Sequence, residues 1–254
     1  MLREELKIFF TAVMFYTRIP VPKSTGFSPE ALNRATRYFP LIGILVGGAG
    51  GAVFLGSSQF LGIHLSIVIS LLFTVLLTGA FHEDGLADFC DGFGGGVSKE
   101  KILAIMKDSR LGTYGTIALI MLFLVKTGLI AEIGLREIPL AILVAGAWSR
   151  LNPVLLIYTS TYVTDTDGSK SKPVGLKGSA ATLVIALIFG LAPLLLVDWK
   201  IIPLLVGTQL IILLLFRGYL HRKIGGFTGD TLGALQQLSE VGFYLTCVAA
   251  TQVM

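Results

Sequence analysis

Charged residues are scarce in this sequence. Lys, Arg, Asp and Glu make up 14% of the 254 residues, whereas hydrophobic residues make up 54%. A soluble domain carries nearer a quarter charged residues, so the composition argues against a soluble protein. The apolar residues also form long blocks rather than alternating with polar ones. These blocks predict an all-α membrane protein, because only helices and closed barrels satisfy backbone hydrogen bonds in lipid, and barrel strands are shorter and alternate.

Cysteine is almost absent as well. Cys90 lies by an acidic segment and Cys247 in the last apolar block, and neither placement suits a structural disulfide or a zinc site. There is no internal repeat, low-complexity tract or linker, so residues 1–254 are expected to form one integral membrane domain. The apolar segment 6–16 is too short to span a bilayer and lacks a small-residue cleavage site. We expect it to be an interfacial helix rather than a removable signal peptide.

Seven apolar blocks approach the roughly 20 residues that a membrane-spanning helix needs. They cover residues 39–58, 63–81, 113–132, 138–160, 179–197, 201–217 and 232–252. Sixteen of the twenty basic residues lie in the N-terminal segment and in the loops after the second, fourth and sixth blocks. The positive-inside rule then predicts seven spans with the N-terminus and these loops in the cytoplasm. The net charge of +4 therefore needs no nucleic-acid partner.

Some residues inside the apolar blocks predict helix contacts or function. Gly43, Gly47 and Gly51 recur every four residues, which allows a second helix to approach closely. Arg150 is an intramembrane charge, which is costly and by default functional, so we expect it to pair with a phosphate or a carboxylate. Lys126 is expected to reach the interface or to pair with Glu132.

The acidic residues are concentrated at one place. The stretch FHEDGLADFCDGFGGG, residues 81–96, contains four of the sixteen. Asp84, Asp88 and Asp91 have the i, i+4, i+7 spacing of one helical face, whereas Glu83 points about a quarter turn away. The glycines that follow predict a helix C-terminus, where the macrodipole disfavours anions. A divalent cation is therefore expected to compensate these charges.

The type of side chain narrows the choice of cation. Carboxylates without a His or Cys cluster favour Mg²⁺, Mn²⁺ or Ca²⁺, and the spacing is not that of an EF-hand loop. Mg²⁺ usually takes a few carboxylates together with water and substrate phosphates, which indicates phosphate chemistry. His82 is either a base or ligand of this site or a hydrogen-bonded bystander. A solvated acidic helix end is the alternative interpretation of the cluster.

Two further polar segments border predicted spans on the same side of the membrane. They are KDSRLGTYG, residues 107–115, and RKIGGFTGDTLGA, residues 222–234. Both offer cations, glycines and backbone amides suited to phosphate. Their candidate site residues are Lys107, Asp108, Arg110, Thr228 and Asp230.

Five motifs together make the sequence recognisable. HEDGLADFCDG, MKDSRLGTYG, TRIPVP, RYFPLIG and GGFTGDTLGA closely resemble the adenosylcobinamide-GDP ribazoletransferases, also called cobalamin 5′-phosphate synthases. The resemblance covers nearly the whole chain. The ribazoletransferase family in turn looks distantly related to the CDP-alcohol phosphotransferases. In this sequence, however, Asp84-Gly85 is followed by Ala87-Asp88 without the Ala-Arg of that wider family.

The resemblance implies a multi-pass enzyme of the bacterial cytoplasmic membrane, with its active site facing the cytoplasm. Such an enzyme joins adenosylcobinamide-GDP to α-ribazole or its 5′-phosphate in the last stage of cobalamin assembly, releases GMP and requires Mg²⁺. Metal ligands would be Asp84, Asp88, Asp91 and Glu83, and one of these or His82 would accept the proton. Substrate contacts would come from Lys107, Asp108, Arg110, Arg150, Thr228 and Asp230. The lower base, the number of metal ions and the oligomeric state stay open.

Two other functions compete with this one. A membrane prenyltransferase also holds a diphosphate through aspartates and Mg²⁺, but it is expected to carry two Asp-rich motifs. A divalent-cation transporter would place acidic ligands near the membrane midplane, whereas these are predicted at its cytoplasmic end.

Overall fold

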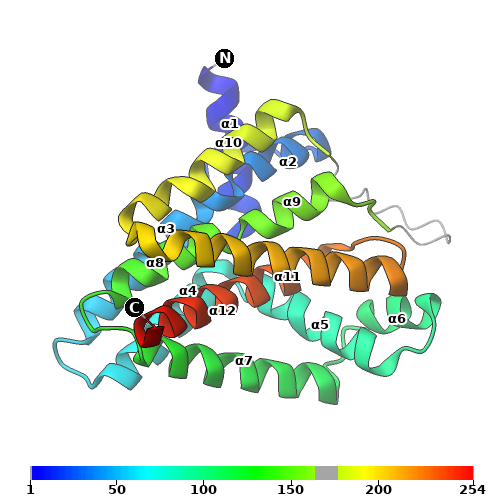
Figure 1. Ribbon diagram of the computed structural model, residues 1–254. Helices are drawn as coiled ribbons and strands as arrows, with labels where there is room; N and C mark the ends of the chain where they lie inside the picture. The colour runs from blue at the N-terminus through cyan, green and yellow to red at the C-terminus, as the bar shows by residue number, and fades with distance from the viewer. Residues whose placement is uncertain (1, 164–176, 254) are drawn as a thin grey trace.

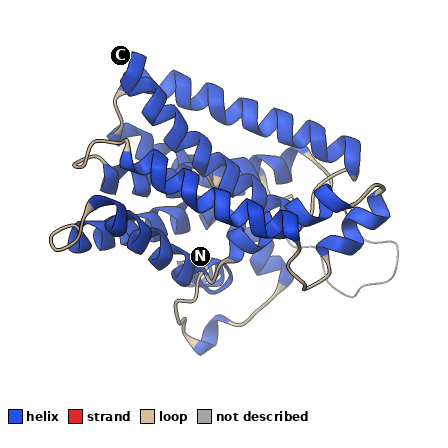
Figure 2. Ribbon diagram, turned by 90° about the horizontal axis from the view of Figure 1, so that it is seen from below, coloured by secondary structure: helices blue, strands red, loops and turns tan. Residues whose placement is uncertain are grey.

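The computed structural model describes residues 2–163 and 177–253, and these are helical nearly throughout (Figures 1 and 2). The described part contains no β-strand, only an isolated parallel bridge between Tyr162 and Phe227. The α-helices are α1 Leu2–Tyr16, α2 Pro29–Ala35, α3 Phe39–Ser57, α4 Ile63–Thr78, α5 Phe81–Gly95, α6 Lys99–Met106, α7 Thr113–Ala131, α8 Ile138–Trp148, α9 Leu151–Thr159, α10 Ala180–Leu191, α11 Ile202–Lys223 and α12 Gly229–Val253. The all-α prediction is confirmed. Lys170 and Lys172, two of the predicted cytoplasmic charges, lie outside the described residues.

Fewer helices than the predicted seven are long and apolar enough to cross a membrane. Four stretches of the described chain qualify, namely Pro29–Ser57, Thr113–Ala131, Ile138–Thr159 and Trp199–Lys223. A fifth results if α4 and α5, which meet at 90°, count as one broken span. The block at 179–197 becomes the shorter apolar stretch Ala180–Leu196. The block at 232–252 lies within α12, which carries a buried polar side described below.

Helices α3 and α8 cross at their glycines, as the small-residue spacing predicted. A Cβ atom on Gly47 would lie 2.6 Å from the carbonyl oxygen of Ile142, and one on Gly146 would lie 3.2 Å from the Cα of Gly47. Any side chain at these positions would push the two backbones apart. The close crossing buries α8 in the centre of the molecule, where Ile142, Val144 and Trp148 form part of the core.

The chain breaks sharply between α4 and α5. Gly79 and Ala80 both adopt left-handed conformations, with φ of 68° and 58°, and α5 leaves at 90° to α4. The predicted helix end at the glycines is confirmed, because α5 ends at Gly95, but this helix does not continue the preceding span. Asp84 lies in the first turn of a separate helix, where the macrodipole favours a carboxylate. The acidic face runs along the length of α5.

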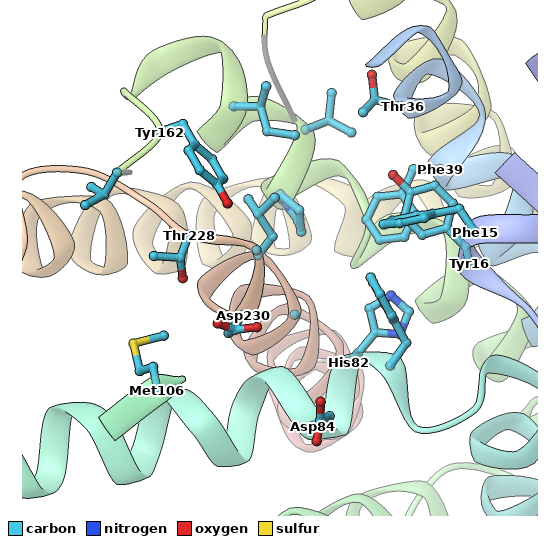
Figure 3. Close-up of a pocket in the computed structure, with 18 of the residues that line it drawn as sticks. Phe15, Tyr16, Thr36, Phe39, His82, Asp84, Met106, Tyr162, Thr228 and Asp230 are labelled. Atoms are coloured by element: carbon cyan, nitrogen blue, oxygen red, sulfur yellow. The ribbon is translucent and has the colours of Figure 1, made fainter. Parts of the chain in front are cut away.

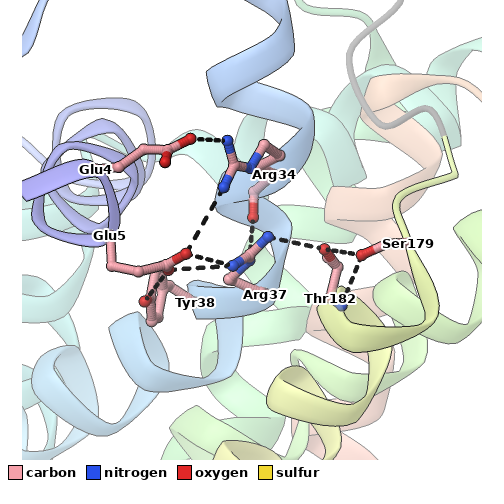
Figure 4. Close-up of polar contacts among 7 residues, drawn as sticks. All are labelled: Glu4, Glu5, Arg34, Arg37, Tyr38, Ser179 and Thr182. Atoms are coloured by element: carbon pink, nitrogen blue, oxygen red, sulfur yellow. Dashed lines mark hydrogen bonds and ion pairs between the residues drawn. The ribbon is translucent and has the colours of Figure 1, made fainter. Parts of the chain in front are cut away.

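The N-terminal helix is fixed to the bundle by polar contacts (Figure 4). The buried guanidinium of Arg37 donates to both carboxylate oxygens of Glu5 on α1, at 3.0 and 3.1 Å, and to the hydroxyl of Thr182 on α10. Tyr38 donates to the same Glu5 carboxylate. These bonds hold the first turns of α1 against the segment that precedes α3, whereas the end of α1 is held by the buried Tyr16, whose ring stacks on Phe39 with centroids 4.3 Å apart. The interfacial position of α1 in a membrane stays a prediction.

Candidate active site

A cavity of about 330 Å³ opens beside the N-terminal ends of α5 and α12 (Figure 3). Its walls come from the end of α1, the start of α3, the end of α6, and α9. Asp84, Lys107 and Asp230 supply charged side chains to the lining. Phe15, Tyr16, Phe39 and Phe81 form an aromatic side of the same cavity. We call this cavity the acidic pocket; it combines a polar floor with an apolar wall.

Two glycines bring the acidic helices together. A Cβ atom on Gly85 of α5 would lie 2.8 Å from the carbonyl oxygen of Asp230, and one on Gly233 of α12 would lie 3.3 Å from the Cα of His82. Figure 3 shows Asp84 and Asp230 on these two facing helices. The close crossing thus places carboxylates from two distant motifs at one cavity. This explains Gly85 and Gly233 by packing, whereas a Cβ atom on Gly229, which lines the pocket, would meet no atom within 4 Å.

The carboxylates of this region repel one another. Asp88, one turn beyond Asp84, experiences the negative charges of Asp230, Asp84 and Asp91. Burial raises the pKa of Asp230 above its ordinary value, and the neighbouring Asp84 raises it further. Such a group of like charges is stable as carboxylates only when positive charge is supplied.

No three His, Cys, Asp or Glu side chains in the described part of the chain are arranged to hold a metal ion by themselves. The donors still suit a hard cation, because they are carboxylate oxygens only and repel one another. Mg²⁺ is commonly held by one or two carboxylates with substrate phosphates filling other positions. The pocket therefore fits a cation that substrate phosphates help to bind, and does not form a complete protein cage.

Asp91 differs from the other aspartates in its hydrogen bonding. Its two carboxylate oxygens accept hydrogen bonds from the backbone amides of Gly112, at 2.7 Å, and Gly115, at 2.9 Å. Asp91 thereby satisfies amide groups at the N-terminus of α7, which otherwise lack partners. A Cβ atom on Gly115 would lie 2.5 Å from Asp91 Oδ2. The glycines of LGTYG thus admit Asp91, and two of the amides expected to bind phosphate are already bonded.

Glu83 and His82 lie towards the interior. Glu83 is buried, and one of its oxygens accepts a 2.9 Å hydrogen bond from Gln237 Nε2 on α12. His82 lines the acidic pocket, is buried, and stacks on Phe39 with ring centroids 5.6 Å apart. The quarter-turn offset of Glu83 from Asp84 is confirmed, and it directs these adjacent carboxylates to different environments.

The N-terminus of α12 meets the pocket next to Asp230. Thr228 and Thr231 cap this helix reciprocally, since the amide of each is bonded to the hydroxyl of the other at 2.9 and 3.3 Å. Thr228 and Gly229 also line the pocket. A helix N-terminus attracts anions through its free amides and its dipole. Lys107 enters the lining from the end of α6.

Comparison with known proteins assigns the chain to a family. The model of the cobalamin-5-phosphate synthase family matches residues 8–248. The adenosylcobinamide-GDP ribazoletransferase of Vibrio cholerae El Tor is 44% identical over 252 residues, which cover 99% of this chain and 97% of the relative. The Shewanella oneidensis protein of the same name is 41% identical over 258 residues, covering 99% and 97%. The chain belongs to the cobalamin-5-phosphate synthase family. No solved structure matches it.

Arg110 and Asp108 of this cobalamin-5-phosphate synthase homologue form hydrogen bonds with each other at the surface. The Arg110 Nη2 to Asp108 Oδ2 distance is 2.6 Å, and Arg110 Nε adds a bond of 3.0 Å. These hydrogen bonds lower the pKa of Asp108 to about 2. The Arg110 side chain is 87% exposed and is absent from the pocket lining. Of the two predicted phosphate-binding cations, the structure therefore places Lys107 in the pocket and Arg110 outside it.

Arg150 lies deep in the bundle rather than in the pocket lining. Its Nη1 donates a 2.6 Å hydrogen bond to the carbonyl oxygen of Gly146, and the guanidinium lies 5.4 Å from the centre of the Phe39 ring. The carboxylates of Glu240 and Glu83 interact electrostatically with this guanidinium. Arg150 was predicted to pair with a phosphate or a carboxylate, and the structure places it under the influence of carboxylates.

Some residues of the site region were not predicted from sequence. The aromatic wall was missed because its members sit in apolar segments, where an aromatic residue gives no distinctive signal. Glu240, with Gln236 and Gln237, was missed although an ionisable residue inside a predicted span is itself an indication of function. Lys126 does not pair with Glu132 as expected. Its Nζ lies 3.1 Å from Glu240 Oε2.

Proposed function

We propose that this chain is an adenosylcobinamide-GDP ribazoletransferase that works in the acidic pocket. The proposal is supported by near full-length similarity to proteins of that name. The single structural observation that supports it most strongly is the meeting of Asp84 and Asp230, from two separate family motifs, in one cavity. The reaction would transfer the phosphocobinamide group of adenosylcobinamide-GDP to α-ribazole or its 5′-phosphate and release GMP.

The chemistry is a displacement at phosphorus. A ribose hydroxyl oxygen of the acceptor forms a bond to the phosphorus that carries the cobinamide arm, and the bond from that phosphorus to the GMP oxygen breaks. Catalysis of such transfers consists mainly of positioning and charge stabilisation. In this proposal the proton of the attacking hydroxyl passes to Asp230, a carboxylate of the pocket lining that is not assigned to the metal ion.

We further propose that Asp84 and Asp88 bind Mg²⁺ together with the diphosphate of the donor. When bound there, the cation would neutralise charge on the diphosphate and on the departing GMP. Lys107 contacts the phosphates from the end of α6. Thr228 and the N-terminus of α12 orient them, because backbone amides at that end attract anions. Asp91 supports the site by fixing the start of α7 beside α5.

The pocket is proposed to face the cytoplasm of a bacterial cell. The basic loops favour this orientation, and Figure 1 places α6, the start of α7 and the end of α11 at one end of the bundle. Single cysteines at Ser98 and Ser57, in a chain with Cys90 and Cys247 changed to serine, should react with impermeant reagents from opposite sides. Labelling of both from the same side would contradict the orientation.

The deciding experiment measures GMP release by the purified protein supplied with adenosylcobinamide-GDP and α-ribazole. We expect release to depend on the acceptor and on Mg²⁺. A prenyltransferase would release diphosphate from a prenyl donor and leave adenosylcobinamide-GDP intact. A transporter would release no nucleotide but would move cations into vesicles. Either result would reject the proposed function.

A further inference from the structure

A second group of charged residues lies next to the acidic pocket but deeper among the helices. It consists of Glu83 on α5, Lys126 on α7, Arg150 before α9, and Gln236, Gln237 and Glu240 on α12. We call this group the inner cluster. Its four charged members are two carboxylates and two cations, so their formal charges balance.

The inner cluster is connected by short polar contacts. Lys126 Nζ lies 3.1 Å from Glu240 Oε2 and donates a 2.6 Å hydrogen bond to Gln237 Oε1. Gln237 Nε2 in turn donates to Glu83 Oε1 at 2.9 Å. A continuous chain of contacts thus runs from Glu240 on α12 to Lys126 on α7, returns to α12 at Gln237, and ends at Glu83 on α5. Lys126 is only 2% exposed, and a charge at such a position is retained at considerable cost.

The inner cluster also surrounds a small cavity of about 30 Å³. Four buried polar atoms without a hydrogen-bond partner belong to residues that line it, namely His82 Nε2, Glu83 Oε2, Arg150 Nε and Gln236 Oε1. Such a volume holds one or two water molecules, which need two to four polar partners each. Ordered water in this cavity would complete the network and make it rigid.

The helices that the inner cluster joins also carry the carboxylates of the acidic pocket. Glu83 directly precedes Asp84 on α5, and Gln237 lies two turns beyond Asp230 on α12. Lys126 lies on α7, whose first turn is bonded to Asp91. Any shift of α5 against α12 would therefore change the geometry of the acidic pocket and of the inner cluster together.

We propose that Lys126 and Glu240 are positioning residues for the reaction in the acidic pocket. Their ion pair, extended through Gln237 to Glu83, sets the separation of Asp84 and Asp230. This inference rests on the proposed function. A misplacement of about 1 Å at reacting groups can reduce turnover on the order of 100-fold, so contacts outside the pocket can limit the rate.

The test uses Lys126→Met, Glu240→Gln and the double variant, all purified in detergent. Either single change leaves an unpaired buried charge, whereas the double change leaves Glu83 and Arg150 in balance. Glu132→Gln, an exposed carboxylate just after α7, is the matched control. Steady-state rates are measured with adenosylcobinamide-GDP varied, and amide hydrogen exchange is followed in residues 81–95 and 229–240.

We expect each single variant to lose roughly 10- to 100-fold in kcat, with a less than about threefold change in KM for the donor. Exchange should accelerate in both segments. The double variant should recover most of the kcat and most of the protection, and the control should match the parent. This pattern separates positioning from general stability, because a merely structural pair would change the melting temperature but not the kcat of folded enzyme.

Folded single variants with parental kcat and parental exchange would overturn the inference. So would a double variant as slow as Lys126→Met. If Lys126→Met does not fold, Glu240→Gln and the double variant decide by the same criteria. If the parent itself releases no GMP, the proposed function fails, and the exchange of the two segments still tests whether the pair fixes α5 against α12.

Discussion

Glu83 and Asp84 are neighbours in sequence but belong to two different regions of the molecule. Glu83 points into the inner cluster, where Gln237 donates to it and the two buried cations balance the charge. Asp84 lines the acidic pocket opposite Asp230, among carboxylates that repel one another. The difference teaches that the number of acidic residues does not identify a reactive site. The balance of charge around the acidic residues is what distinguishes the acidic pocket from the inner cluster.

The two regions follow from opposite electrostatic requirements. A buried network is stable when each charge has a partner and each polar atom a hydrogen bond. The inner cluster approaches that condition with Lys126 and Arg150. The acidic pocket does not, because its carboxylates gather on two close helices and need positive charge from outside. The first region therefore suits a fixed structure, and the second suits a phosphate substrate that arrives with a cation.

The largest effect is expected from removing the charge of the two proposed metal ligands, Asp84 in the lining of the acidic pocket and Asp88 one turn further along α5. Asp84→Asn and Asp88→Asn should each reduce kcat on the order of 100-fold or more, by analogy with the loss of other groups that stabilise transition-state charge. Asp198→Asn, at an exposed carboxylate outside the lining of the acidic pocket, should match the parent. The measurement is GMP release by variants that elute as folded protein. Near-parental rates in both aspartate variants would remove the distinction between the regions.

The next effect is expected where the two acidic helices touch. Gly85→Ala places a Cβ 2.8 Å from the carbonyl oxygen of Asp230, so α5 must move away from α12. We expect a loss of roughly 1–3 kcal/mol in stability together with lower kcat. Gly56→Ala, where a Cβ meets no atom within 4 Å, is the control. Thermal unfolding and steady-state kinetics are measured on the same samples, and equal behaviour of the two variants would contradict the close crossing.

Lys107 and Arg110 provide a smaller and more selective comparison. Lys107 lines the acidic pocket, so Lys107→Ala should weaken donor binding roughly tenfold or more, as expected for one hydrogen bond to a charged group. Arg110 is exposed and bonded to Asp108, so Arg110→Lys should change donor binding by less than about twofold, as surface pairs contribute little. Binding is measured by equilibrium dialysis with the donor. A large loss in Arg110→Lys would show that the guanidinium leaves Asp108 for phosphate.

The smallest effect on chemistry is expected from Asp91. Asp91→Ala removes both acceptors of the Gly112 and Gly115 amides, and losing a helix cap costs about 0.5–2 kcal/mol. The melting temperature should fall, while kcat should fall less than in Asp84→Asn. A rate loss equal to that of Asp84→Asn, without destabilisation, would return Asp91 to the set of metal ligands.

Composition and helical periodicity were enough to predict the helical membrane fold, the glycine crossing of α3, and the divergence of Glu83 from Asp84. They were not enough to predict the break at Gly79 and Ala80, because a left-handed alanine has no local sequence signature. The end of the acidic helix at its glycines was predicted, but its start as a separate helix at Phe81 was missed for that reason. Residue spacing predicts which side chains share a face of one helix, whereas the bend between α4 and α5 depends on tertiary packing.

The same limit explains which site residues could be found. Asp84, Lys107 and Asp230 were predicted from local motifs, and the structure brings them to one cavity. The pairing of Lys126 with Glu240 joins residues on different helices, so it cannot be predicted from residue spacing within one helix. Arg110 was predicted to bind phosphate, and Asp108 to contact the substrate, because they are charged and lie near the acidic motif. Their mutual hydrogen bonds depend on loop geometry that sequence does not specify.

The account depends most directly on a cation that binds in the acidic pocket together with the donor. Mn²⁺ binding to the purified protein, followed by electron paramagnetic resonance, tests this without turnover when adenosylcobinamide-GDP is added and α-ribazole is withheld. We predict weak binding to the protein alone, one tight site per chain when the donor is present, and loss of that site in Asp84→Asn. Equally tight binding without the donor, or an unchanged tight site in Asp84→Asn, would contradict the account.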